Sequence, residues 1–237
     1  MKPILFSTPM VQAILEGRKT MTRRTLKPQP HPSIEVHKWG YSALTPPGYI
    51  ELRGKFNCEG VFQSAMKFFK CPYGQPGDVL WVREKFRKHH PVDEYGYIDF
   101  ETTIVDYAAD NPEPLYLTDG DGFVRTNKDG SEKFVPFQPS IHMPKAACRI
   151  WLQITNIRVE RLQEISEADA KAEGVLEYED GYFKNYFTKK GLRESDGVEC
   201  MMAKGSFQSL WCKINGLESW TSNPWVWVVE FKRIDKP

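Results

Sequence analysis

Three segments rich in β-branched and aromatic residues place the strongest constraint on the fold of this 237-residue chain. They span residues 79–84, 149–159 and 225–234, and their composition is typical of strands that are largely buried. Only short helical patterns lie between them. Strands scattered among a few short helices predict an α+β fold, specifically a small mixed β barrel with helices at its rim, rather than a doubly wound sheet.

The sequence also predicts three short helices. Pro9 suits the first position of a helix that ends at Gly17, and the stretch 19–26 that follows is expected to be a strand or a strand-like loop. A second helix is expected between Ser166, which begins a pattern like a capping box, and Gly174. The apolar face of a third helix consists of Phe207, Leu210, Trp211 and Ile214.

The charge is balanced overall but unevenly distributed. The 32 basic and 31 acidic residues give a net charge of +1, which excludes a polybasic protein that binds through net charge alone. Residues 1–28 hold six basic residues and one acidic residue, whereas residues 91–130 hold ten acidic and two basic ones. Residues 87–140 therefore resemble an acidic insertion, which we expect to be the most mobile and least core-like part, with a hairpin turn at residues 129–130.

The sequence predicts a soluble, cytoplasmic protein without a metal or a cofactor. The first ten residues lack the pattern of a signal peptide, and the longest uncharged apolar run, residues 224–229, is too short to span a membrane. The five cysteines lack a C-x-x-C pair and are expected to be reduced. Zinc-binding patterns of His and Cys are absent, as are the glycine-rich loops of ATPases and dinucleotide enzymes.

The most distinctive stretch is G-R-K-T-M-T-R-R, residues 17–24, which places four cations and two hydroxyl groups directly after a predicted helix end. Clustered cations lower the pKa of Lys19, so that a neutral amine base becomes accessible to a nearby threonine nucleophile, and the arginines could hold phosphate. The alternative is a solvated basic edge of a strand. In a regular strand Lys19 and Thr22 would face opposite sides, so a shared site requires a bend.

Two further features have two interpretations each. Glu173 is expected in the last turn of the second helix, where the helix dipole disfavours a carboxylate. It is either an exposed residue with a small energetic cost or a carboxylate that faces a basic pocket. Aromatic and basic residues alternate over residues 178–190, where they either stack on bases or pack the loop onto the domain.

Four motifs in their order along the chain resemble the ASCH family, which belongs to the PUA-like superfamily of small β barrels associated with RNA and modified bases. They are G-R-K-T-x-T-x-R, P-G-D-V-L-W-V-R-E, I-S-E-A-D-A-K-A-E-G and W-V-W-V-V-E-F. The fuller pattern is similar to a longer phage and prophage branch, sometimes labelled morphogenetic. The resemblance covers about half of the chain. It implies one domain, residues 1–237, with branch-specific additions around residues 30–70, 87–140 and 177–204.

The resemblance implies RNA or a modified nucleobase as the partner and suggests a hydrolase. Small bacterial members remove the acetyl group from N4-acetylcytidine, with a lysine base, a threonine nucleophile and a glutamate that correspond to Lys19, Thr22 and Glu173. Other members resemble ribonucleases or RNA binders. The residues expected to bind nucleic acid are Arg18, Arg23, Arg24 and Arg83. Two alternatives remain open: a nucleic-acid reader or regulator without catalysis, and a phage assembly factor without a nucleic-acid role.

Overall fold

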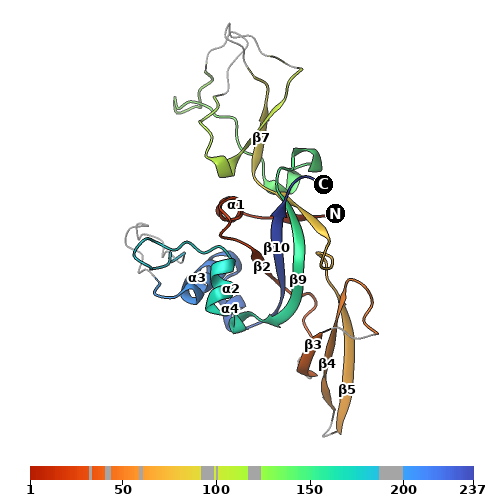
Figure 1. The fold of residues 1–237 in the computed structure, drawn as a ribbon. Coiled ribbons are helices and arrows are strands. Elements are labelled where there is room, and N and C mark those ends of the chain that lie inside the picture. Colours follow the sequence, from red (N-terminus) through yellow and green to blue (C-terminus); the bar gives the residue numbers. More distant parts are fainter. Residues whose placement is uncertain are drawn as a thin grey trace.

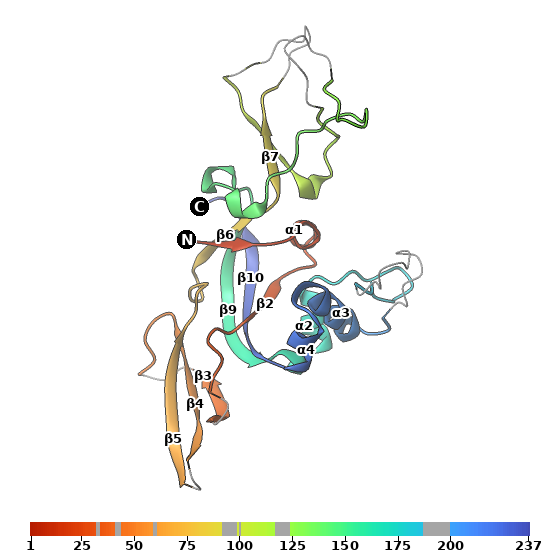
Figure 2. The ribbon, with the colours of Figure 1, turned by 180° about the vertical axis from the view of Figure 1, so that it is seen from behind.

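A computed structural model gives the structure of the protein and describes residues 1–31, 34–40, 44–58, 61–91, 99, 101–116, 124–186 and 200–237. Its centre is a five-stranded sheet in the order β1-β6-β9-β10-β2 (Figures 1 and 2). These strands are β1 (Lys2–Leu5), β2 (Met21–Thr25), β6 (Val79–Arg83), β9 (Trp151–Arg161) and β10 (Trp225–Ile234). The three strands that dominate the sequence pattern are therefore neighbours at the middle of the sheet, with β1 and β2 as the flanking edge strands.

Short helices lie beside this sheet, as the sequence predicts. The α-helices are α1 (Thr8–Leu15), α2 (Glu167–Ala172), α3 (Ala203–Asn215) and α4 (Leu217–Thr221). The 3₁₀ turns are η1 (Ala108–Asp110), η2 (Ser140–His142), η3 (Lys145–Ala147) and η4 (Leu162–Glu164). Ser166 caps α2, because its hydroxyl accepts a hydrogen bond from the Asp169 N–H at 3.1 Å. In both ribbon views α2, α3 and α4 group together on the β2 side of the sheet.

The long antiparallel pair of β9 and β10 forms the backbone of the sheet. Its register shifts after Glu230, which pairs with Asn156, because Phe231 pairs with Ile154 and leaves Thr155 as an extra residue. This β-bulge adds twist to the strand pair. Beside it, the Phe231 N–H donates to the Thr20 carbonyl at 2.8 Å, so the bulge lies next to the chain that leads into β2.

The α+β class is confirmed, and the described strands form three sheets; in the five-stranded one the two edge strands are not paired with each other, so the expected barrel is not closed among the described strands. β1 and β2 are these two edges, and β1 pairs with β6 in parallel while β2 pairs with β10 antiparallel. The edges nevertheless approach each other through one side chain, since Arg24 Nη2 donates to the Leu5 carbonyl at 2.6 Å. The space between these edges is where the candidate site lies.

The addition at residues 30–70 is more ordered than the sequence suggests. It forms a three-stranded sheet of β3 (Ile34–Gly40), β4 (Tyr49–Cys58) and β5 (Val61–Lys70). Ile50, Leu52 and Phe69 are buried in the main hydrophobic core. Prolines at its borders obscured this addition in the sequence, because they interrupt the periodicity on which strand prediction depends.

The acidic addition at residues 87–140 extends from the other end of the central sheet and supplies none of its strands (Figure 1). It contains the two-stranded pair β7 (Phe86–His89) and β8 (Ile104–Tyr107). The predicted turn is present at Gly130, where φ is 82° and the Asn127 N–H donates to the Ser131 carbonyl. None of the helices in the described part of the chain has the length and apolar character that crossing a membrane requires.

A buried ion pair joins this acidic addition to the central sheet. Glu84 is 1% exposed, and Arg149 donates to its two carboxylate oxygens from Nε and Nη2 at 3.0 Å each. The same guanidinium donates to Asp110 in η1 at 2.6 Å and lies over the Tyr107 ring at 3.9 Å. Arg149 therefore connects Glu84, the residue after β6, with Asp110 of η1 in the acidic addition.

Candidate active site at a buried lysine–glutamate pair

The turn after α1 provides the bend that a shared site requires. Gly17 adopts a φ of 78°, and the Lys19 N–H then donates back to the Ala13 carbonyl at 2.9 Å. Lys19 forms an isolated antiparallel bridge with Glu173, and regular pairing begins only at Met21. The alternation of a strand therefore does not separate Lys19 from Thr22, and both line one pocket.

The end of α2 brings Glu173 to this bridge. Glu173 is the C-cap residue, and Gly174 follows it with a φ of 84°. A Cβ at residue 174 would stand 2.7 Å from the Lys19 Cβ and 2.9 Å from the Ala13 Cβ. Glycine is therefore required here both by its backbone conformation and by the close approach of the chain to Lys19.

Lys19 and Glu173 form a buried ion pair. The Lys19 Nζ donates to Glu173 Oε2 and to the Glu173 carbonyl, both at 2.8 Å, and the two residues are 3% and 4% exposed. Burial lowers the pKa of Lys19; Glu173 opposes this effect, while Arg24 and Arg23 add to it. The carboxylate thus faces a basic pocket, which is the second of the two interpretations of Glu173.

Arg23 is fully enclosed beside this pair. Its guanidinium donates to Glu173 Oε1 at 3.2 Å, to Asp169 Oδ2 at 2.7 Å and to Glu160 Oε1. The side chain is 0% exposed. The structure therefore engages the expected phosphate-binding group with three carboxylates of the protein itself.

The pocket next to the pair has a volume of about 210 Å³. Thr22, Arg24 and Thr25 of β2 line one side of it, together with Lys19 and Glu173. The other walls are mostly apolar and come from the segment after β1, from α1 and from α3: Phe6, Met10, Phe207, Leu210, Trp211 and Ile214. Ser7 and Asn215 also line the pocket, so the side chains that carry charge and a hydroxyl meet a space that is mainly apolar.

The other predicted nucleic-acid contacts are distributed unevenly. Arg24 lines the pocket and lies over the Phe6 ring. Arg18 is not among the residues that line the pocket; it donates to the Gly174 carbonyl at 2.9 Å, next to Glu173 in the sequence. Arg83 is not brought to the pocket: it donates to the carbonyls of Ile141 and Met143 beside the acidic addition.

The sequence did not indicate that α3 forms a wall of the pocket. It also did not indicate Glu160 and Asp169, two of the three carboxylates that bind Arg23. The helical pattern marks Phe207 and Leu210 as apolar, but an apolar helix face is equally suited to a core. Within residues 178–190, Phe183 is buried and the Leu176 N–H donates to the Tyr186 hydroxyl at 3.1 Å, so these two rings pack the loop onto the domain. Residues 187–190 lie outside the described residues.

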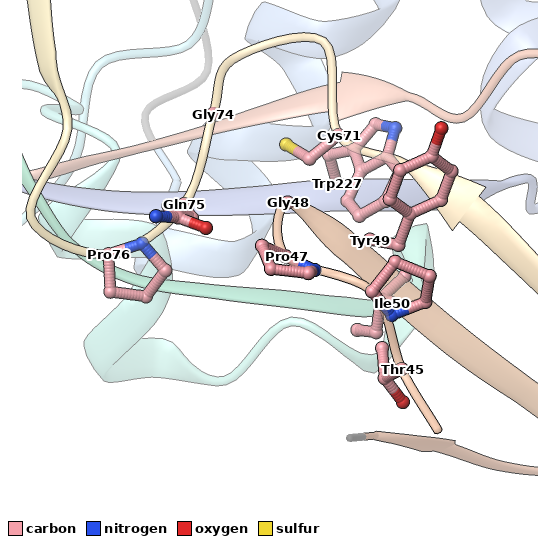
Figure 3. Close-up of a pocket in the computed structure, with 11 residues that line it drawn as sticks. Thr45, Pro47, Gly48, Tyr49, Ile50, Cys71, Gly74, Gln75, Pro76 and Trp227 are labelled. Atoms are coloured by element: carbon pink, nitrogen blue, oxygen red, sulfur yellow. The ribbon is translucent and has the colours of Figure 1, made fainter. Parts of the chain in front are cut away.

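A second, larger pocket of about 340 Å³ lies between the start of β4, the loop before β6 and β10 (Figure 3). Tyr49, Ile50 and Trp227 provide its apolar surface. Cys71 adds a thiol, a group that can act as a nucleophile. Burial raises the pKa of the Cys71 thiol, which keeps it protonated and unreactive. This pocket lacks the combination of base, carboxylate and hydroxyl that the first one has.

The first pocket is therefore the candidate active site. It combines an amine of lowered pKa, a carboxylate in contact with that amine, and a hydroxyl on the adjacent strand. Among the described residues no group of three or more His, Cys, Asp or Glu side chains is arranged to hold a metal ion. Comparison with known proteins gives no match: no family model fits the sequence, and no curated protein or solved structure is significantly similar to it.

Proposed function

We propose that the protein is a hydrolase of N-acylated pyrimidine nucleosides, such as N4-acetylcytidine. The observation that carries the proposal is the convergence of Lys19, Glu173 and Thr22 on one small pocket. A buried amine with a lowered pKa is a competent general base, and a threonine beside such a base is a competent nucleophile. The resemblance to the ASCH family, with its PUA-like barrel, supports the same reaction.

In this mechanism neutral Lys19 takes the proton of the Thr22 hydroxyl while the threonine oxygen attacks the acyl carbon. The C–N bond then breaks, and the proton passes from Lys19 to the leaving exocyclic amine. Glu173 orients the amine of Lys19 and stabilises its protonated form. Water hydrolyses the threonine ester, which releases the carboxylic acid and restores the hydroxyl. One water is consumed, and neither oxidant nor reductant takes part.

The size and lining of the pocket suit such a substrate. Its volume of about 210 Å³ is below the roughly 300–1,000 Å³ that encloses drug-sized ligands, which favours a single base with a short acyl group. The apolar walls from Phe6 and α3 suit a planar ring, and Arg24 supplies a cation near the hydroxyl-bearing strand. Arg24 follows Thr22 by two residues, so both side chains leave the same face of β2.

The direct test is incubation of the purified protein with N4-acetylcytidine, with cytidine and acetate measured after chromatographic separation. We expect turnover that is absent with N4,N4-dimethylcytidine, which offers no acyl carbon to the nucleophile. Unchanged N4-acetylcytidine after long incubation at several pH values, with a protein that is folded by circular dichroism, would contradict the proposal.

A non-catalytic reader of nucleic acid is the second candidate, and two arginines of the basic stretch favour it. Arg24 lines the pocket, and Arg18 donates to the carbonyl of Gly174, the residue after Glu173. We expect weak binding of single-stranded RNA that decreases with salt, because phosphate contacts release counterions. Replacing both arginines with alanine should reduce the slope of log K against log salt by about 1.4, at about 0.7 per phosphate contact.

Fluorescence anisotropy with a labelled oligonucleotide measures this slope. Arg83→Ala is the matched control, because Arg83 binds carbonyl groups beside the acidic addition and should leave the slope unchanged. RNA affinity that is independent of salt and of both arginines would remove the proposed surface. The absence of any RNA binding would favour the third alternative, an assembly factor.

A further inference from the structure

Arg23 is the one charged group at the pocket whose role the proposed reaction does not explain. Its guanidinium is enclosed and binds three carboxylates from two elements: Glu160 of β9, and Asp169 and Glu173 of α2 and its C-cap. Two of these carboxylates lie outside the reaction. The third, Glu173, is the partner of Lys19.

The two oxygens of Glu173 are divided between two cations. Arg23 Nη1 donates to Oε1 at 3.2 Å, and Lys19 Nζ donates to Oε2 at 2.8 Å. Because a carboxylate is planar, holding Oε1 fixes the direction in which Oε2 points. The anchors at Asp169 and Glu160 in turn fix the guanidinium against α2 and β9. Arg23 thus connects the position of Glu173 to the rigid strand pair at the centre of the sheet.

We propose that Arg23 is a positioning residue of this active site, which holds Glu173 so that its second oxygen faces Lys19. The inference deepens the proposed function and rests on it. It assigns Arg23 to the pocket's own machinery and removes it from the surface that contacts phosphate.

The electrostatics of the pair give the proposal its direction. The groups that face Lys19 are Glu173 from the end of α2, and Arg23 and Arg24 from β2. Glu173 raises the pKa of Lys19, whereas both arginines lower it. Removing the charge of Arg23 leaves Glu173 to interact with Lys19 alone. The loss of the Arg23 charge raises the pKa of Lys19, so less of the amine is neutral at a given pH.

The chain offers a matched control in Arg158. This arginine binds Glu160 at 2.9 Å and Asp169 at 2.6 Å, two of the three carboxylates that Arg23 binds. Its third partner is Glu230, so it does not contact Glu173. Arg158→Gln therefore disturbs the same ionic network without releasing the carboxylate that faces Lys19.

The test compares Arg23→Gln with Arg158→Gln in two measurements. The first is the pH profile of kcat/KM with N4-acetylcytidine, and the second is the pKa of Lys19 from NMR of protein that contains ¹³C-labelled lysine. For Arg23→Gln we expect kcat/KM to fall about a hundredfold and both the acid limb and the NMR pKa of Lys19 to rise. Arg158→Gln should leave both pH values in place, and Arg23→Lys should restore much of the lowered pKa, because the charge returns.

An unchanged pKa of Lys19 in Arg23→Gln, or an equal rise in Arg158→Gln, would overturn the positioning role. If the wild-type protein does not hydrolyse N4-acetylcytidine but the NMR pKa moves as expected, the proposed function fails, whereas the coupling of Arg23 to the Lys19–Glu173 pair stands. Should Arg23→Gln not fold, Arg23→Lys carries the test, because a single amine cannot hold Asp169 and Glu173 together. Its kcat should fall relative to Arg158→Lys, and an equal kcat would contradict the proposal.

Discussion

Replacing Thr22 with valine is expected to reduce the hydrolysis of N4-acetylcytidine by at least about 10³-fold, because this isosteric change removes only the nucleophilic oxygen. Lys19→Met should cost about 10²- to 10⁴-fold through loss of the general base. Steady-state assays at saturating substrate measure both effects. The loss should appear in kcat, since neither group contributes much to the shape of the apolar walls that bind the base.

Thr25→Val is the matched control for this experiment. Thr25 lines the same pocket, but it is the last residue of β2, three residues beyond Thr22 and six beyond Lys19. It should retain activity, and Thr22→Val should keep its melting temperature. Lys19→Met is expected to lose stability as well, because it removes one partner of a buried pair. Equal activity in Thr22→Val and Thr25→Val would exclude Thr22 as the nucleophile.

The largest effect on stability is expected for Arg149→Met, which leaves Glu84 buried without its partner. Breaking a buried pair in this way costs about 3–5 kcal/mol of the free energy of unfolding. Asp110→Asn is the control, because it removes only the half-exposed contact of the same guanidinium and should cost about 1 kcal/mol or less. Urea unfolding at pH 7.5 measures both changes, and equal costs would contradict the prediction.

The cost of Arg149→Met should also depend on pH. Burial raises the pKa of Glu84, and Arg149 opposes that rise, so removing Arg149 raises the pKa further. The native state then binds a proton more readily than the unfolded state, and stability is lost as the pH rises through the folded pKa of Glu84. The variant should therefore recover part of its stability at pH 5.5. A deficit that is equal at both pH values would exclude Glu84 as its cause.

The helices and strands whose signals come from residues nearby in the sequence were predictable without the structure. Pro9 and Gly17 delimit α1, Ser166 caps α2, and the composition of residues 225–234 predicts β10 with the bounds that the structure gives. Each of these signals acts within about one turn or one strand, so it does not require knowledge of the tertiary fold. The strands within residues 30–70 could not be predicted from such local signals. They are stabilised by pairing with one another and by packing against core residues from distant parts of the sequence.

The candidate site divides in the same way. The clustering of Lys19 and Thr22 after a helix end is a local property, and the sequence alone drew attention to it. That Glu173 contacts Lys19 across 154 residues, and that Arg23 faces inward to three carboxylates, was decided by the order of strands in the sheet and by the close approach at Gly174. A charge pattern does not distinguish a solvated cation from an enclosed one, because burial depends on which elements pack above it. The sequence therefore determined which groups are available for chemistry, and the tertiary structure decided which of them share a pocket and which hold the others in place.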